Sequence, residues 1–167
     1  MKHISASHIL NGRTLLPLLL LTFLCQRATG QEDLHTTGKL IITFTEIRSG
    51  VGNIAMGLYD AEDQWTDDPL HNYAWDKGVL RNGKITIEID SLPIARYACA
   101  VLDDEDCSFS MNYLLGGLPV EGWGMSNNPP FLKLKKPAFR EVSFDLAQQV
   151  TRIEIKMNYL NRRKKVE

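Results

Sequence analysis

The sequence predicts an all-β fold, an antiparallel sandwich of two sheets with about seven strands. Apolar and polar residues alternate with a period of two along several short segments, and no segment shows a convincing helical period. Clusters of glycine, asparagine, serine and proline separate these segments, which is typical of strands joined by turns. Several short strands of this kind favour two packed sheets.

Six strands follow from the alternation, over residues 39–47, 53–59, 84–89, 97–102, 141–146 and 152–159. The first two are joined by a glycine-containing hairpin turn, and Asn82-Gly83 predicts a tight turn before the third. The fourth is almost entirely apolar, as expected of a strand covered on both faces. We expect a short seventh strand near residues 131–134 and two long loops, over 60–81 and 103–130.

Residues 1–30 have the features of a secretory signal peptide. Lys2 and Arg13 give a basic start, residues 15–25 are apolar, and Ala28-Thr29-Gly30 supplies small residues at a cleavage site. The apolar run has 11 residues, whereas a helix needs roughly 20 to cross a bilayer. We therefore expect a cleaved signal and an exported mature chain, periplasmic or secreted, without a transmembrane segment.

A lipid anchor on Cys25 is the alternative for this terminus, because a cysteine directly follows the apolar run. Bacterial lipidation sites need a small residue before the cysteine, and Leu24 is bulky. The sequence therefore disfavours lipidation at this position.

Three parts are expected after the signal peptide. Residues 31–37 form a flexible leader, 38–160 the β-sandwich domain and 161–167 a basic C-terminal tail. From residue 31 onward the chain has 20 acidic and 16 basic residues, for a net charge of −4. That charge, together with export, disfavours a nucleic-acid partner.

The segment 117–128 is the most distinctive in the chain and reads Gly-Leu-Pro-Val-Glu-Gly-Trp-Gly-Met-Ser-Asn-Asn after an acidic run at 103–106. It resembles the signature of a bacterial family, domain-of-unknown-function family 2141. Segments 52–59 and 91–98 resemble strands of the same family, so the similarity covers residues 38–160. The resemblance implies an exported β-sandwich, immunoglobulin-like or transthyretin-like, with no established activity.

The acidic loop in this family resembles a calcium loop, which has Asp or Asn at alternate positions followed by Gly. Phe109 stands here where the glycine turn is expected, and Leu115 where the closing glutamate is expected. These departures favour a solvated acidic loop over a calcium site. On an extended chain alternate acids face the same way, which pairs Asp104 with Asp106. The oxygen-bearing positions of the candidate metal site are Asp104, Asp106, Ser108 and Asn112.

The sequence indicates no catalytic residues and no cofactor. It contains no Gly-x-Ser-x-Gly motif, and His35 and His71 are the only imidazoles after the signal peptide. No ligand spacing suggests zinc, and no carboxylate pair is marked for glycoside hydrolysis. Cys99 and Cys107 could form a disulfide in an oxidising compartment, or Cys99 could be a free buried thiol.

Aromatic side chains offer the remaining candidate site. Trp65, Tyr73, Trp75 and Trp123 could stack on sugars, or they could cover an open end of the core, and the sequence favours covering. The candidate binding residues belong to the signature segment, and are Glu121, Trp123, Ser126, Asn127 and Asn128.

We expect a non-catalytic exported module with a binding or structural role at the bacterial cell envelope. Its partner would be an envelope polysaccharide or another envelope protein. The alternatives are a loop-borne calcium- or carbohydrate-binding domain and, less favoured, an enzyme that acts on envelope glycans.

Overall fold

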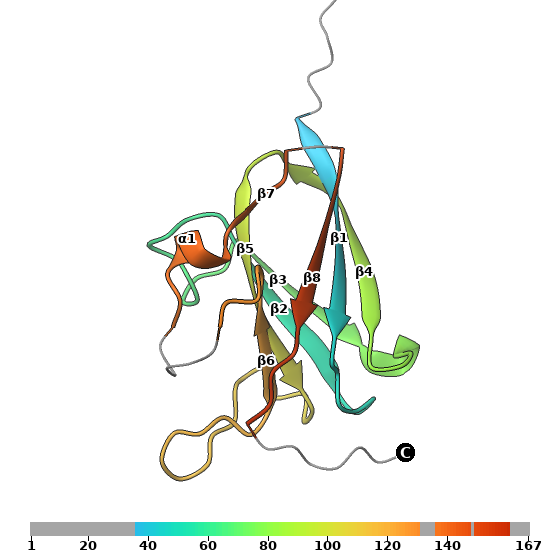
Figure 1. Ribbon diagram of the computed structural model, residues 1–167, viewed down its shortest axis with the longest axis vertical. Coiled ribbons are helices and arrows are strands. Elements are labelled where there is room, and N and C mark those ends of the chain that lie inside the picture. Colours follow the sequence, from blue (N-terminus) through green and yellow to red (C-terminus); the bar gives the residue numbers. More distant parts are fainter. Residues whose placement is uncertain (1–35, 131–135, 148, 161–167) are drawn as a thin grey trace, which may run out of the picture. The chain divides into compact units, whose positions relative to one another are not determined.

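The computed structural model describes residues 36–130, 136–147 and 149–160 (Figure 1). The chain divides into two compact units, Met1–Leu34 and His35–Glu167, and all described residues belong to the second. The expected signal peptide, most of the leader, the strand at 131–134 and the basic tail lie outside the described residues. No described helix is long and apolar enough to cross a membrane.

Two β-sheets form the described unit, which confirms the predicted all-β fold. The smaller sheet has the order β4-β1-β8, and in the larger sheet the order is β3-β2-β5-β6, with β7 also paired to β5. Most pairs are antiparallel. The strands are β1 (Thr37–Thr45), β2 (Asn53–Tyr59), β3 (His71–Asp76), β4 (Ile85–Pro93), β5 (Arg96–Asp104), β6 (Gly122–Met125), β7 (Phe144–Asp145) and β8 (Val150–Lys156).

The pairing of β1 with β8 is the parallel exception in a mostly antiparallel sandwich. The register starts at Lys39 opposite Val150, so both strands begin at the same end (Figure 1). β7 belongs to the larger sheet, and β8, the next strand along the chain, begins at that end of the smaller sheet. Because β8 starts where β1 starts, the two strands run in the same direction.

The core lies between the inner faces of the two sheets. Each strand contributes alternate residues, which is the physical cause of the period-two pattern in the sequence. Burial of this apolar surface is the main stabilising contribution to the fold. Its fully buried members include Leu40, Ile42, Phe44, Ile54, Leu58, Cys99, Leu146 and Ile155.

Several elements differ from the predictions. β3 lies inside the expected 60–81 loop and β6 inside the expected 103–130 loop. A one-turn helix, α1 (Phe139–Val142), replaces the first part of the strand expected at 141–146 and leaves only β7. β8 ends at Lys156, not at 159, and η1 (Lys77–Val79) is a short 3-10 turn after β3. These pieces are short, and periodicity needs a longer run to become visible.

Candidate functional site

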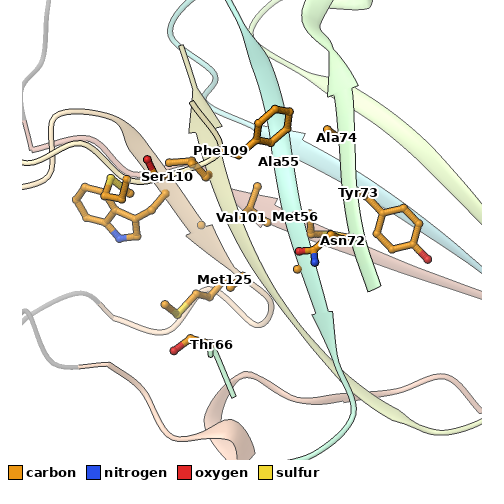
Figure 2. A pocket seen from close by; sticks show the side chains of 16 residues that line it. Ala55, Met56, Thr66, Asn72, Tyr73, Ala74, Val101, Phe109, Ser110 and Met125 are labelled. Atoms are coloured by element: carbon orange, nitrogen blue, oxygen red, sulfur yellow. The ribbon is translucent and has the colours of Figure 1, made fainter. Parts of the chain in front are cut away.

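The outer face of the larger sheet carries small side chains at its centre. The central residues are too small to fill the space above the sheet, and they are Ala55, Gly57, Ala74 and Ala100. On β6, the larger side chains of Trp123 and Met125 project from the same face. The result is a groove of about 770 Å³ (Figure 2). The strand register forms it from two rows across the sheet, Trp123-Leu102-Ala55-Ala74 and Met125-Ala100-Gly57-Asn72.

Other segments close the two ends of the groove. At one end lies a small apolar cluster, separate from the main core, to which α1 and the loop after β2 contribute. At the other end residues 109–111 form a wall. Figure 2 shows Phe109 near Ala55 and Ala74, towards one end of the groove, and Met125 with Thr66 towards the other. None of the described residues that line the groove is charged.

The four consecutive acids at 103–106 alternate between two environments. Asp103 and Glu105 are paired with cations, Lys77 and Arg48 respectively. Asp104 and Asp106 instead lie together with Glu121. The period-two geometry of an extended chain causes this division, and the predicted pairing of Asp104 with Asp106 describes it correctly.

Lys77 and Asp103 form an ion pair with no solvent exposure of either side chain. The Lys77 ammonium also donates to the carbonyl oxygen of Val51, at 2.5 Å. The Tyr159 hydroxyl donates to the second carboxylate oxygen of Asp103. Burial raises the pKa of Asp103, and the hydrogen bonds from Lys77 and Tyr159 oppose that shift.

Arg48 and Glu105 form a two-pronged ion pair beside this buried pair. The guanidinium donates from Nε and Nη2 to the two carboxylate oxygens at 2.8 and 2.6 Å. It also lies over the ring of Tyr159, 4.6 Å from the centroid. These hydrogen bonds from Arg48 hold the pKa of Glu105 below its ordinary value. The pair therefore joins the β1–β2 connection to the end of β5.

The carboxylates of Asp104, Asp106 and Glu121 lie within 4.8 Å of one another, and those of Asp104 and Glu121 are buried. None of the three forms an ion pair with a described residue. Protein N–H groups occupy all six oxygens. Asp104 accepts from the amides of Ser108 and Phe109, Asp106 from the Ser108 amide and the Asn112 side chain, and Glu121 from the amides of Glu105 and Asn112.

The candidate metal residues therefore gather, but in different roles from those expected. Ser108 and Asn112 donate N–H groups to the carboxylates. Leu115 is fully exposed, and Glu121 closes the cluster in its place. Phe109, at the expected glycine position, adopts the left-handed backbone with φ 56°. Such a cluster could offer oxygens to a hard cation such as calcium, yet its hydrogen bonds already hold the loop.

The family model described as "Uncharacterized protein conserved in bacteria (DUF2141)" matches residues 42–154. The chain belongs to this family. The match extends from β1 to β8 and includes the groove and the acidic cluster of the DUF2141 domain. No curated protein and no solved structure matches the chain.

The Gly-Trp-Gly part of the DUF2141 signature is explained by the two faces of β6. Trp123 lies on the outer face and is 8% exposed. Gly122 and Gly124 lie on the inner face, where a Cβ atom would collide with Tyr159 at 122 and would lie 2.7 Å from Ile155 at 124. The glycines are required because β6 passes close to residues 155–159.

The last three candidate binding residues of the signature are occupied in structural contacts. The Ser126 hydroxyl accepts from the Cys99 amide and donates to the Val142 carbonyl. The Asn127 amide group donates to the Ser143 carbonyl. The Asn128 side chain pairs with the backbone of β8, accepting from the Lys156 amide. These residues tie β6 to its neighbours and do not line the groove.

Cys99 and Cys107 are both free thiols in this structure. Cys99 faces the core in the middle of β5, whereas Cys107 is exposed beyond the end of that strand. Burial raises the pKa of the Cys99 thiol, which keeps it protonated and unreactive. A free buried thiol at position 99 is one of the two alternatives that the sequence leaves open.

Of the aromatic residues, Trp123 lines the groove and Trp65 closes one end of it. Tyr73 and Trp75 stack on each other with centroids 5.4 Å apart, packed against the core. The groove itself was missed, although the sequence carries a signal for it. Small residues alternate with core residues in the two central strands, at Ala55 and Gly57 and again at Ala98 and Ala100.

Proposed function

We propose that this DUF2141 domain is a non-catalytic binding module of the bacterial cell envelope, which takes a neutral polysaccharide in the groove on its larger sheet. The groove is the observation that carries the proposal. Its volume of about 770 Å³ lies in the range of ligand sites, which measure roughly 300–1,000 Å³. The signal-like features of residues 1–30 and the bacterial family support the envelope as its location.

The lining of the groove fits a sugar better than an ionic ligand. A pyranose presents apolar C–H faces and a rim of hydroxyl groups. Leu102, Trp123 and Phe109 supply apolar and aromatic surface, and Asn72, Thr66 and Ser110 supply hydrogen-bonding groups at the sides. Because the described lining residues include no charge, no ionic group has to lose its water when a neutral saccharide enters.

Phe109 is the wall residue whose conformation supports a binding role. A left-handed φ of 56° is unfavourable for a bulky side chain, and 65% of the residue is nevertheless exposed. Non-glycine residues held in sparsely populated backbone regions cluster at binding sites. Asp104 maintains this conformation by accepting the Phe109 amide at 3.1 Å. The acidic cluster thereby positions an aromatic ring at the groove.

The absence of acidic and imidazole side chains from the described lining favours binding over glycan hydrolysis. Glycosidases need two carboxyl groups beside the scissile bond, and the acids at 104, 106 and 121 are engaged by N–H groups. We therefore propose no catalytic step.

Isothermal titration with neutral N-acetylglucosamine oligomers tests the proposal. We expect saturable binding by the wild type and at least a tenfold loss in Ala100→Gln, which places a long side chain on the groove floor. Thr43→Gln is the matched control, since Thr43 lies on the outer face of the smaller sheet. Equal binding by both variants, or binding only of an extended peptide, would contradict a sugar site in the groove.

A further inference from the structure

The buried Lys77–Asp103 pair has an unusual setting among the ion pairs of the described residues. It is the one in which neither side chain reaches solvent. Lys77 begins η1 directly after β3, and Asp103 lies 26 residues further along the chain, on the inner face of β5. A buried ion pair contributes little net stability because both ions lose their hydration. The pair therefore invites a chemical explanation.

The contacts of the pair orient an amine against a carboxyl group. Nζ of Lys77 donates to Oδ1 of Asp103 and to the carbonyl oxygen of Val51. The Tyr159 hydroxyl donates to Oδ2, the other oxygen of the same carboxyl group. One oxygen thus faces the amine while the other faces an O–H donor, and the surroundings exclude water.

We propose that Lys77 and Asp103 condense to an intramolecular amide bond between Nζ and Cγ. One proton first moves from Nζ to the Asp103 carboxyl group, because a dry site favours the neutral amine and acid over two ions. The Nζ lone pair then attacks Cγ and forms the C–N bond. The Cγ–Oδ1 bond breaks, and Oδ1 leaves as water with the transferred proton and a second proton from Nζ. Nothing is oxidised or reduced, and no co-reactant is needed.

Tyr159 acts in this step as the donor that stabilises negative charge on Oδ2 while Cγ is tetrahedral. A preoriented donor in a water-excluded site is an effective stabiliser of such an oxyanion. Burial, reinforced by the neighbouring Asp103 charge, raises the pKa of Tyr159, so the hydroxyl keeps its proton. Holding amine and carboxyl in contact also removes the entropic cost of bringing them together.

The other ion pairs lack one requirement each. Lys39 is partly exposed and Lys136 is exposed, so water reaches both amines. Arg48 and Arg96 carry guanidinium groups, which stay protonated and cannot attack. Lys77 is the described lysine that combines an ion pair with full burial. A bond there would fasten the end of the edge strand β3 to β5, across β2.

Mass spectrometry of the purified full-length chain under denaturing conditions tests the proposal. Loss of water lowers the mass by about 18 Da relative to the sequence, after the N-terminal peptide has been assigned. Trypsin should leave Lys77 uncleaved and join segments 49–81 and 97–133 in one product. A mass equal to that of the sequence, with separate peptides and cleavage after Lys77, would overturn the proposal. This result needs only the wild-type protein.

Variants of Lys77, Asp103 and Tyr159, with Lys39→Met as the control, test the role of each residue. Lys77→Met and Asp103→Ala should each restore the full mass, whereas Lys39→Met, at a partly exposed ion-paired lysine, should keep the deficit. Tyr159→Phe retains the ring and removes the donor, so we expect the crosslinked fraction to fall at least tenfold at early times after synthesis. An unchanged rate of crosslinking in Tyr159→Phe would overturn the role of the hydroxyl group. Whether the crosslink exists is decided separately, by the mass of the wild-type protein.

Discussion

Gly122 lies directly against the ring of Tyr159, so that a Cβ atom at position 122 would overlap the ring. Tyr159 in turn donates to Asp103 and lies beneath Arg48. The glycine therefore allows β6 to approach the segment that contains Tyr159. This segment contacts the ion pairs of Asp103 and Arg48. This contact links the family signature to the stability of the fold.

We expect Gly122→Ala to destabilise the protein by about 1–3 kcal/mol, the usual cost of overpacking a close contact. Urea unfolding followed by circular dichroism measures this. Gly50→Ala is the matched control, because the nearest atom to its added Cβ would be 3.9 Å away. An equal loss of stability in the two variants would show that the approach of β6 to Tyr159 is not what requires the glycine.

The Arg48–Glu105 pair predicts a specific acid dependence. The pKa of Glu105 is below its ordinary value of 4.5 in the folded state, so the pair stabilises the fold at higher pH and loses this effect as pH falls through the folded pKa. The difference in melting temperature between wild type and Glu105→Gln should therefore be largest at about pH 6 and shrink towards about pH 3. Glu62→Gln, at an exposed loop position, should show no such trend.

Trp123→Ala should destabilise the protein by about 3 kcal/mol or more, because the indole is largely buried and its removal leaves a cavity. Trp123→Phe should recover much of this loss. Thermal unfolding of the three proteins is the measurement. Full stability of Trp123→Ala would contradict the role of Trp123 in covering the core. It would favour the alternative, in which the indole stacks on sugars.

Calcium should leave the melting temperature unchanged. All six oxygens of Asp104, Asp106 and Glu121 already accept N–H groups, so the loop is held without a cation. Differential scanning calorimetry with excess chelator and then with millimolar calcium checks this. A ligand that binds only the native state would raise the stability by about 2.7 kcal/mol at a hundredfold its dissociation constant. A rise of that size, lost in Asp104→Ala, would establish a metal site.

Asp104→Ala should weaken oligosaccharide binding although position 104 does not line the groove. Without the carboxylate, the amide of Phe109 loses its acceptor and the ring is no longer held in the left-handed conformation. We expect a several-fold loss of affinity by titration. Asp90→Ala, at an exposed acid of β4 in the smaller sheet, is the control. Undiminished affinity in Asp104→Ala would separate the acidic cluster from the groove.

Sequence periodicity predicts those strands well that bury one complete face. β1 and β2 are examples, since Leu40, Ile42 and Ile54 alternate with outward residues over a whole strand. The same reasoning failed for β6, whose glycines suggest turns when the sequence is considered alone. Their physical cause is the proximity of Tyr159 and Ile155, which no local pattern encodes.

Only the contacts between residues close together along the chain could be predicted for the site. Alternation along the chain correctly pairs Asp104 with Asp106. Glu121 joins them from a point 16 residues beyond Glu105, because the segment 105–121 folds back when β6 pairs with β5. Likewise, β3 was hidden by its polar outward residues, and without β3 the groove has no second edge. The alternation of apolar and polar residues can be recognised within one segment, whereas the pairing of distant strands cannot.

The most direct test of the central claim, that the groove binds a neutral saccharide, is an NMR titration of the ¹⁵N-labelled domain with N-acetylglucosamine oligomers. Our account predicts that the amides which shift are those of β2, β5 and β6 around the groove, with Phe109 and Trp123 among them. The amides of β4, β1 and β8 should stay in place. Shifts confined to the smaller sheet, or no shifts at millimolar sugar, would contradict it.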